Sequence, residues 1–308
     1  MTTAIITGPI TQFVDPDVKA IVQGMTGRSG RLHSQLMRAY GTRIVGGISP
    51  AGGVDAVDGV PLFKTCAEAV AVTGASASVA MVPPLAVQAA IEEAVAAGIK
   101  LIVTIAEGMP VADSVRALEA VRAAGARWVG PSTPGLAIPG RLKLGFLPDV
   151  SLVPGPLGIM AKSGTLSYEV CHRLVGRNLG QSLWVGVGGD LVKGTRFADL
   201  LPFLLADPDT KAIVVIGEIG GSEEEELAAA MRTLNCSKPV YALIAGRTAR
   251  EGVTMGHAGA IILGDVGTIA SKTEALVGAG AHVFTKIRDL VDAVADGFGQ
   301  TMGAKACS

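Results

Sequence analysis

His257 lies in a run of small residues at positions 256–260, Gly-His-Ala-Gly-Ala. Small residues on both sides let the backbone come close to a ligand. Two other turns rich in small residues precede it: residues 163–165, Ser-Gly-Thr, at the expected start of a helix, and residues 217–222, which carry Glu218. A histidine nucleophile, a hydroxyl-rich helix N-terminus and an orienting carboxylate are the groups needed to carry a phosphoryl group on histidine. Together, the three turns favour this chemistry over a buried structural histidine.

Each companion turn also has a simpler interpretation. Ser163 or Thr165 would satisfy free amides as an ordinary helix N-cap, and Glu218 would pair with a nearby Lys or Arg. If Glu218 instead accepts the Nδ1 proton of His257, it fixes the tautomer and leaves Nε2 free to attack phosphorus. The acidic run at residues 223–226 is interpreted as an exposed helix start favoured by the helix dipole, and no metal site is expected.

A fourth turn, Gly24-x-x-Gly27-x-x-Gly30, is also rich in glycine and follows an apolar run at residues 20–23. The amides of such a turn bind a phosphate at the positive end of the following helix. A dinucleotide site would add an acidic residue after the second strand, but residues 44–50 contain none. This absence weakens the case for NAD and favours another phosphorylated adenosine ligand.

Composition excludes several other classes of protein. The 308 residues are 49% hydrophobic, carry a net charge of −1 and contain no Lys/Arg block, which argues against a nucleic-acid-binding surface. The four cysteines are widely spaced, so neither a metal knuckle nor a disulfide framework is indicated, and reduced thiols in the cytoplasm are expected. Residues 69–91 lack charge, but Gly and Pro interrupt them, and no signal peptide or membrane span is expected.

Strand and helix patterns alternate along the whole chain, which predicts an α/β fold with two doubly wound parallel sheets in tandem. A Gly- and Pro-rich stretch at residues 140–156 separates the two series, so we expect domains at 1–150 and 151–308. The expected strands are 20–23, 43–48, 77–82, 101–105, 128–129, 157–160, 182–186, 212–216, 240–244 and 282–284. One expected helix follows the Gly24 turn and ends near residue 40. The other expected helices span 86–97, 112–124, 165–178, 197–206, 223–234, 271–278 and 287–298.

From about Ala20 to Gly297 the ordered motifs resemble the alpha-subunit family of succinyl-CoA synthetase, which includes malate–CoA ligase and citryl-CoA synthetase relatives. The motifs are the Gly24 turn with His33, Tyr40-Gly41-Thr42, Val82-Pro83, Ile105-Ala106-Glu107-Gly108, Gly130-Pro131-x-x-Pro134-Gly135, Ser163-Gly164-Thr165-Leu166 with Tyr168-Glu169, Gly180-Gln181-Ser182, Gly188-Gly189-Asp190, residues 216–222 and residues 255–262.

The resemblance implies a Rossmann-like domain that binds coenzyme A, followed by a flavodoxin-like ligase domain. His257 would be phosphorylated, with Glu218 as its stabilising partner. A separate ATP-grasp beta subunit would bind ATP or GTP with Mg²⁺, in a heterodimer or an α2β2 heterotetramer. The implied binding residues are Thr26, Gly27, Arg28, Ser29, Gly30, Pro50, Pro83, Ile105, Ala106 and Glu107 for coenzyme A, Ser163, Gly164 and Thr165 for the phosphoryl group, and Tyr168 for a small dicarboxylic acid.

The sequence departs from the family pattern around the acid site. The family has Asn-Cys where this chain has Ser132-Thr133, a Lys in the loop where residues 50–53 have none, Arg at Lys162, and Pro at Leu191. Because the rim of the acid site has changed, we expect the acid to be succinate or a relative such as malate, another substituted dicarboxylate or citrate. Two alternatives remain: a catalytically silent coenzyme A sensor, which would not need His257, Glu218 and Ser163 together, and a nicotinamide oxidoreductase.

Overall fold

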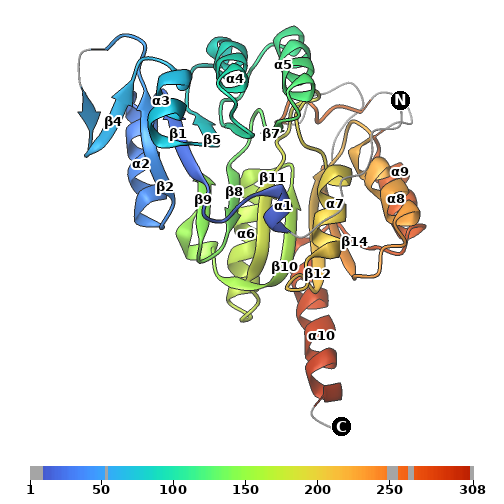
Figure 1. Cartoon of the computed structure of the whole chain (residues 1–308). Helices are drawn as coiled ribbons and strands as arrows, with labels where there is room; N and C mark the ends of the chain where they lie inside the picture. Colours follow the sequence, from blue (N-terminus) through green and yellow to red (C-terminus); the bar gives the residue numbers. More distant parts are fainter. Residues whose placement is uncertain (1–9, 53–54, 248–255, 263–266, 306–308) are drawn as a thin grey trace.

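A computed structural model describes residues 10–52, 55–247, 256–262 and 267–305 of the chain. Each half of the molecule is built on a seven-stranded, mostly parallel sheet (Figure 1). The predicted α/β fold with two doubly wound sheets is therefore confirmed.

The first sheet has the strand order β3-β4-β2-β1-β5-β6-β7. Without the short β3, this is the order of a Rossmann domain, in which the order of the parallel strands reverses between β1 and β5. Strands β5 and β6 are buried along their whole lengths, as expected for a sheet covered on both faces. The strands are β1 (Lys19–Gln23), β2 (Arg43–Ile48), β3 (Ala56–Val57), β4 (Val60–Phe63), β5 (Ala77–Ala80), β6 (Leu101–Thr104) and β7 (Arg127–Val129).

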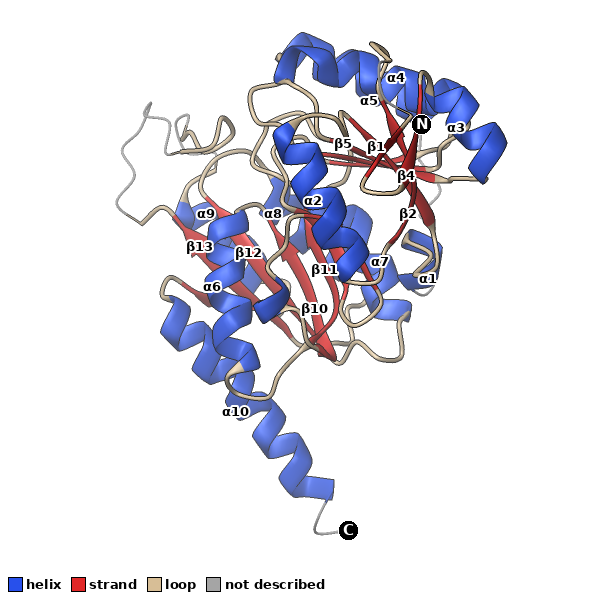
Figure 2. Ribbon diagram, turned by 90° about the vertical axis from the view of Figure 1, so that its left-hand side faces the viewer, coloured by secondary structure: helices blue, strands red, loops and turns tan. Residues whose placement is uncertain are grey.

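Helices cover both faces of the first sheet. Figure 2 shows α3, α4 and α5 on one face, while α2 lies on the other and contacts the second half of the chain. The helices of this half are α1 (Ile10–Phe13), α2 (Arg28–Ala39), α3 (Cys66–Thr73), η1 (Pro84–Ala86), α4 (Val87–Ala96) and α5 (Val111–Ala123).

The second sheet has the order β14-β13-β12-β10-β11-β8-β9. Its five parallel strands follow the flavodoxin order, in which the strand order reverses between β10 and β12. The strands are β8 (Gly135–Ile138), β9 (Leu142–Gly145), β10 (Pro154–Ala161), β11 (Gln181–Gly186), β12 (Ala212–Glu218), β13 (Val240–Ala245) and β14 (His282–Phe284). The helices are η2 (Asp149–Ser151), α6 (Gly164–Val175), α7 (Phe197–Ala206), α8 (Glu223–Thr233), α9 (Ile269–Val277) and α10 (Ile287–Lys305), whose far end extends beyond the body in Figure 1.

The change from one sheet to the other comes earlier than the expected boundary at residue 150. Strands β8 and β9 form an antiparallel hairpin on the edge strand β11 of the second sheet, so sheet membership changes between Val129 and Gly135. The hairpin also joins the two halves, because the Thr42 hydroxyl donates to the Lys143 carbonyl at 2.7 Å and accepts from the Lys143 amide at 3.0 Å. Its Gly and Pro residues made this stretch resemble a linker.

Among the described residues, no helix is long and apolar enough to cross a membrane. Cys66, Cys171 and Cys236 are free thiols, whereas Cys307 lies outside the described residues. Burial raises the pKa of Cys66 to about 12 and that of Cys171 well above its ordinary value. Neither buried thiol is therefore an activated nucleophile.

Candidate active site

His257 and Glu218 are in direct contact. Glu218 is the last residue of the buried strand β12, and its Oε2 lies 2.8 Å from His257 Nδ1. The imidazole is 25% exposed and the carboxylate side chain 9% exposed, so one side of the ring still faces solvent. Because a carboxylate only accepts, the contact places the proton of a neutral imidazole on Nδ1 and leaves the Nε2 lone pair available.

Two glycine turns support the loop that carries this histidine. A Cβ at Gly189 would lie 2.3 Å from His257 Cγ, so the ring rests directly against the Gly189 backbone. The Gly259 amide donates to the Gly189 carbonyl at 3.0 Å. Gly220, at φ +85°, comes so close to Gly259 that a Cβ there would lie 2.1 Å from its carbonyl oxygen. Side chains at either glycine would displace the histidine.

Three charged groups and burial determine the protonation of His257. The hydrogen bond to Glu218 has the largest effect and raises the pKa of the imidazole above its ordinary value of 6.5, with a further contribution from Glu107. Burial and the positive charge of Lys193 lower this pKa, but do not outweigh the carboxylates. Glu107 follows β6 in the first sheet, so both halves of the chain contribute to the electrostatics of the site.

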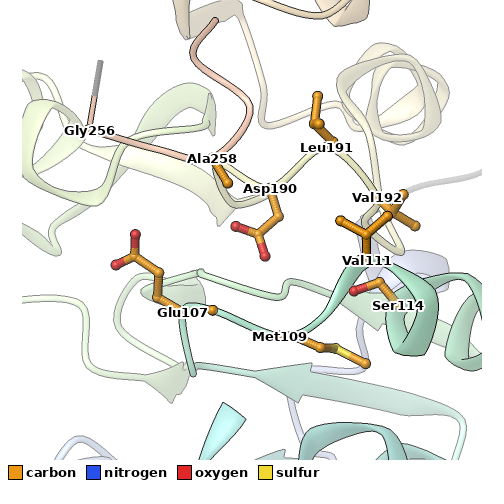
Figure 3. A pocket seen from close by; sticks show the side chains of 10 residues that line it. Glu107, Met109, Val111, Ser114, Asp190, Leu191, Val192, Gly256 and Ala258 are labelled. Carbon is orange, nitrogen blue, oxygen red and sulfur yellow. The ribbon is translucent and has the colours of Figure 1, made fainter. Parts of the chain in front are cut away.

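A cavity of about 230 Å³ lies beside His257, between the two halves. Figure 3 shows Glu107 and Asp190 on opposite sides, with Met109 and Val111 on the same wall as Glu107. Burial is the main reason that the pKa of Asp190 is raised. Asp190 was not among the predicted site residues, although its position after the glycine pair at the end of β11 was a signal for it.

The turn after β10 begins helix α6. Ser163 is its N-cap, and its hydroxyl accepts from the Leu166 amide at 3.3 Å, so the capping interpretation describes its local contact. Thr165 is exposed, and the helix start still offers amides and the positive end of its dipole. Since β10 and β12 are neighbouring parallel strands, this turn and Glu218 follow the same edge of the sheet, at its switch point.

Tyr168 lies one turn into α6, beside Gly164: a Cβ at Gly164 would lie 3.6 Å from the tyrosine hydroxyl. That hydroxyl is buried and has no hydrogen-bond partner among the described residues. Burial raises its pKa to about 12, so it stays protonated. The ring meets Trp184 edge-on at 5.9 Å between centroids. A buried donor without a partner is costly unless a ligand accepts its hydrogen bond.

The glycine turn after β1 leaves the start of α2 open. Gly24 adopts φ +80°, and a Cβ on it would lie 2.6 Å from the Met81 carbonyl oxygen; a Cβ on Gly30 would lie 2.2 Å from the Gly24 carbonyl oxygen. Gly27 is the N-cap and has no side chain to occupy the amides of the first turn. Thr26, Gly27, Arg28 and Ser29 are exposed and Gly30 is buried. This geometry fits a phosphate of coenzyme A at the helix start.

The other predicted coenzyme A residues follow the carboxyl ends of neighbouring strands. Pro50 and Pro83 are exposed after β2 and β5, and Ile105 and Ala106 are half-buried after β6, next to the exposed Glu107. These residues share the carboxyl edge of the first sheet with the glycine turn, as expected for a ligand at a switch point.

The acidic start of α8 differs from the prediction. Glu223 is 3% exposed and Glu224 is fully buried, so the expectation of an exposed acidic run is wrong for these two residues. Lysines from three other segments approach them, and Lys162 Nζ lies 2.9 Å from Glu224 Oε1. Local sequence cannot show these pairings, because the partners lie 30 or more residues away.

Comparison with known proteins agrees with this architecture. The CoA binding domain family matches residues 15–108, and the CoA-ligase family matches residues 160–282. The succinate–CoA ligase (ADP-forming) subunit alpha 1 of Archaeoglobus fulgidus is 44% identical over 92% of this chain and 96% of its own length. An ADP-forming sulfoacetate–CoA ligase subunit of Bilophila wadsworthia is 42% identical over 88% of this chain and 94% of its own.

A solved structure shows the same fold. ATP citrate lyase from Methanothrix soehngenii, in complex with citrate and coenzyme A, aligns with a TM-score of 0.84 at 24% identity over 94% of this chain. This chain spans about half, 51%, of that protein's length.

A Rossmann domain that binds coenzyme A, followed by a flavodoxin-like CoA-ligase domain, defines the class as a subunit of an NDP-forming acid–thiol ligase. The chain belongs to the succinate–CoA ligase alpha-subunit family. The resemblance found in the sequence is confirmed, and the nicotinamide alternative is wrong because the glycine turn belongs to a domain that binds coenzyme A.

Proposed function

We propose that this chain is the alpha subunit of a carboxylate–CoA ligase in which His257 carries the phosphoryl group. The observation that carries the proposal is the 2.8 Å contact between His257 Nδ1 and Glu218, which leaves Nε2 as the free nucleophile. A carboxylate is a poor acylating agent, and passing a phosphoryl group through histidine activates it.

His257 Nε2 attacks the terminal phosphorus of a nucleoside triphosphate; an N–P bond forms and the P–O bond to the leaving diphosphate breaks. A carboxylate oxygen of the acid then attacks that phosphorus, and the N–P bond breaks with its electron pair returning to Nε2. The thiol of bound coenzyme A supplies the final nucleophile: a C–S bond forms, inorganic phosphate leaves from the acyl carbon, and the thiol proton passes to solvent.

The remaining residues are assigned by their positions at the two switch points. The first turn of α6, with Ser163, Gly164 and Thr165, binds the phosphoryl oxygens. The Tyr168 hydroxyl, which has no hydrogen-bond partner in the part of the chain that the structure describes, donates to the acid. The glycine turn at residues 24–30, with Pro50, Pro83 and residues 105–107, binds coenzyme A. Catalysis then consists of positioning three reactants around one imidazole.

The alpha-subunit names of the relatives support a beta partner for this chain. We assign to that partner an ATP-grasp site for ATP or GTP with Mg²⁺, in a heterodimer or an α2β2 heterotetramer. The partner completes the site by bringing the nucleotide to the exposed side of His257.

We assign a small dicarboxylic acid as the substrate. The relatives' names include succinate and sulfoacetate, which are both small dianions. Two residues, Ser132 and Thr133, depart from the family pattern at the rim of the acid site. Thr133 is buried and its hydroxyl donates to the Gly186 carbonyl. Ser132 is half-buried at φ +56°, so of these two residues it is the one available to contact an acid. A serine hydroxyl there suits a hydroxylated acid such as malate as well as succinate.

The test is mass spectrometry of the complex with its beta partner after incubation with magnesium ATP and no acid. One acid-labile phosphoryl group on His257, lost only when coenzyme A and the correct acid of a panel (succinate, malate, citrate) are added, supports the proposal. A protein that binds coenzyme A but gains no phosphoryl group would instead be a catalytically silent sensor.

A further inference from the structure

Six charged side chains form a cluster beneath the His257 site, and five of them are buried. Lys162, Lys193 and Lys272 are at most 5% exposed, and Glu223 and Glu224 at most 3%. Glu225 completes the cluster by approaching Lys272 at 3.1 Å. We call these six residues the lysine–glutamate cluster. Its three positive and three negative charges balance, as burial of so many charges requires.

Each lysine of the cluster is tied to one of the turns around His257. Lys193 donates to the carbonyl of Gly188 and lies 3.0 Å from Glu223 Oε2. Lys272 donates to the carbonyl of Gly221 at 3.0 Å. Lys162 directly precedes Ser163 and pairs with Glu224.

The cluster also reaches the strand that carries Glu218, because Glu224 Oε1 accepts from the Glu218 amide at 3.1 Å. One buried network thus holds the turns after β10, β11 and β12. The network can fix the distances between these turns more rigidly than the exposed loops themselves.

Lys193 has the most direct path to the histidine. It holds the carbonyl of Gly188; the next residue, Gly189, is the backbone surface on which the His257 ring rests. The same turn accepts from Gly259 on the histidine loop. Movement of this turn would therefore move the imidazole relative to Glu218.

We propose that Lys193 is a positioning residue for His257: through its bond to the Gly188 carbonyl it fixes the Gly188–Gly189 turn against the imidazole and so keeps Nδ1 on Glu218. The inference rests on the proposed phosphohistidine function. Removal of the Lys193 side chain would slow phosphorylation of His257, whereas the coenzyme A site on the first sheet would be unchanged.

The test compares two variants in complex with the beta partner. The first variant, Glu223→Gln, keeps an oxygen acceptor for the Phe197 amide, which Glu223 binds at 3.1 Å, and leaves Lys193 bound to the Gly188 carbonyl. The phosphorylation rate of this variant should therefore stay within about threefold of wild type. Lys193→Met with Glu223→Gln removes the support of the turn without leaving an unpaired charge. This double variant should phosphorylate His257 at least about tenfold more slowly, with an unchanged dissociation constant for coenzyme A, because small displacements of a nucleophile are costly.

A second readout separates positioning from charge. Glu218, Glu107, Asp190 and Lys193 are the charged groups that face His257. If the double variant loses the Glu218 contact, the pKa of His257, measured by NMR on labelled full-length chain, falls toward 6.5. If Lys193 acts only through its charge, that pKa rises, because a group that lowers it has gone, and the positioning proposal is overturned.

The matched control is Arg177→Gln with Asp292→Asn, which neutralises a surface ion pair of 2.6 Å on the same half of the chain and should leave the rate unchanged. If the Met variant does not fold, Lys193→Gln with Glu223→Gln replaces it; the shorter Gln cannot span to Gly188, and the same loss is expected. A double variant at the wild-type rate overturns this inference alone. A wild-type complex that never phosphorylates His257 overturns the proposed function itself.

Discussion

Gly189→Ala should disable the histidine while sparing the fold. The added Cβ would lie 2.3 Å from His257 Cγ and 2.5 Å from Nδ1, against about 3.4 Å for the shortest ordinary contact. The ring must therefore move by about 3.4 − 2.3 = 1.1 Å. Because displacements of about 1 Å cost on the order of a hundredfold in rate, we expect phosphorylation of His257 to fall by about two orders of magnitude.

The assay is the rate at which the complex gains phosphoryl label from magnesium ATP, with coenzyme A affinity and the melting temperature measured alongside. Gly189 lacks a positive φ, so alanine fits its backbone and thermal stability should hold. Gly176→Ala is the matched control, since its Cβ would meet nothing closer than 3.4 Å. A Gly189→Ala complex that is labelled at the wild-type rate would refute the role assigned to this contact.

Four further results are expected. Phosphorylation should decline as pH falls through the raised pKa of His257, because the protonated ring has no free lone pair. Glu218→Gln should move this decline to lower pH and slow the reaction by orders of magnitude. A pH–rate profile of both proteins tests these two expectations. Tyr168→Phe should leave phosphorylation intact but slow discharge to the acid by about tenfold, seen in single-turnover experiments, since it removes one buried donor. Arg28→Ala should weaken coenzyme A binding in calorimetry by about tenfold and leave histidine labelling unchanged. Lys272→Met should lower the free energy of unfolding by about 3–5 kcal/mol in urea titrations, because it leaves Glu224 buried with one cation fewer; a loss below 1 kcal/mol would contradict that account.

The sequence alone was enough for the alternation of elements and for the turns that end the strands. Apolar runs such as residues 213–216 and the glycine spacing after β1 are local signals, because burial on both faces and tight backbone approach each restrict which residue types fit. The contact between Glu218 and His257 was also predictable, since it joins a strand end to a Gly-rich turn in a fold whose ligands gather at that edge.

The β8–β9 hairpin was missed for a physical reason. Its Gly135 and Gly145 are so close that a Cβ on Gly135 would lie 1.9 Å from the Leu144 carbonyl oxygen, so glycine marks a close backbone approach there. In the sequence, Gly145 belongs to the Gly- and Pro-rich stretch at residues 140–156, which resembles a linker. Only pairing with β11 reveals that the second half of the fold begins before residue 140.

Tertiary structure alone decided the electrostatics beneath the site. The sequence shows acidic residues at the start of α8 and three scattered lysines, and local rules place all of them in solvent. Lys162 follows β10, Lys193 follows β11 and Lys272 lies in α9, so they come from segments far apart in the chain. They converge on Glu223 and Glu224 because the fold brings these three segments to the start of α8. Local sequence motifs therefore identify the residues that carry the chemistry, whereas the positions of the charged groups that hold those residues in place depend on long-range packing.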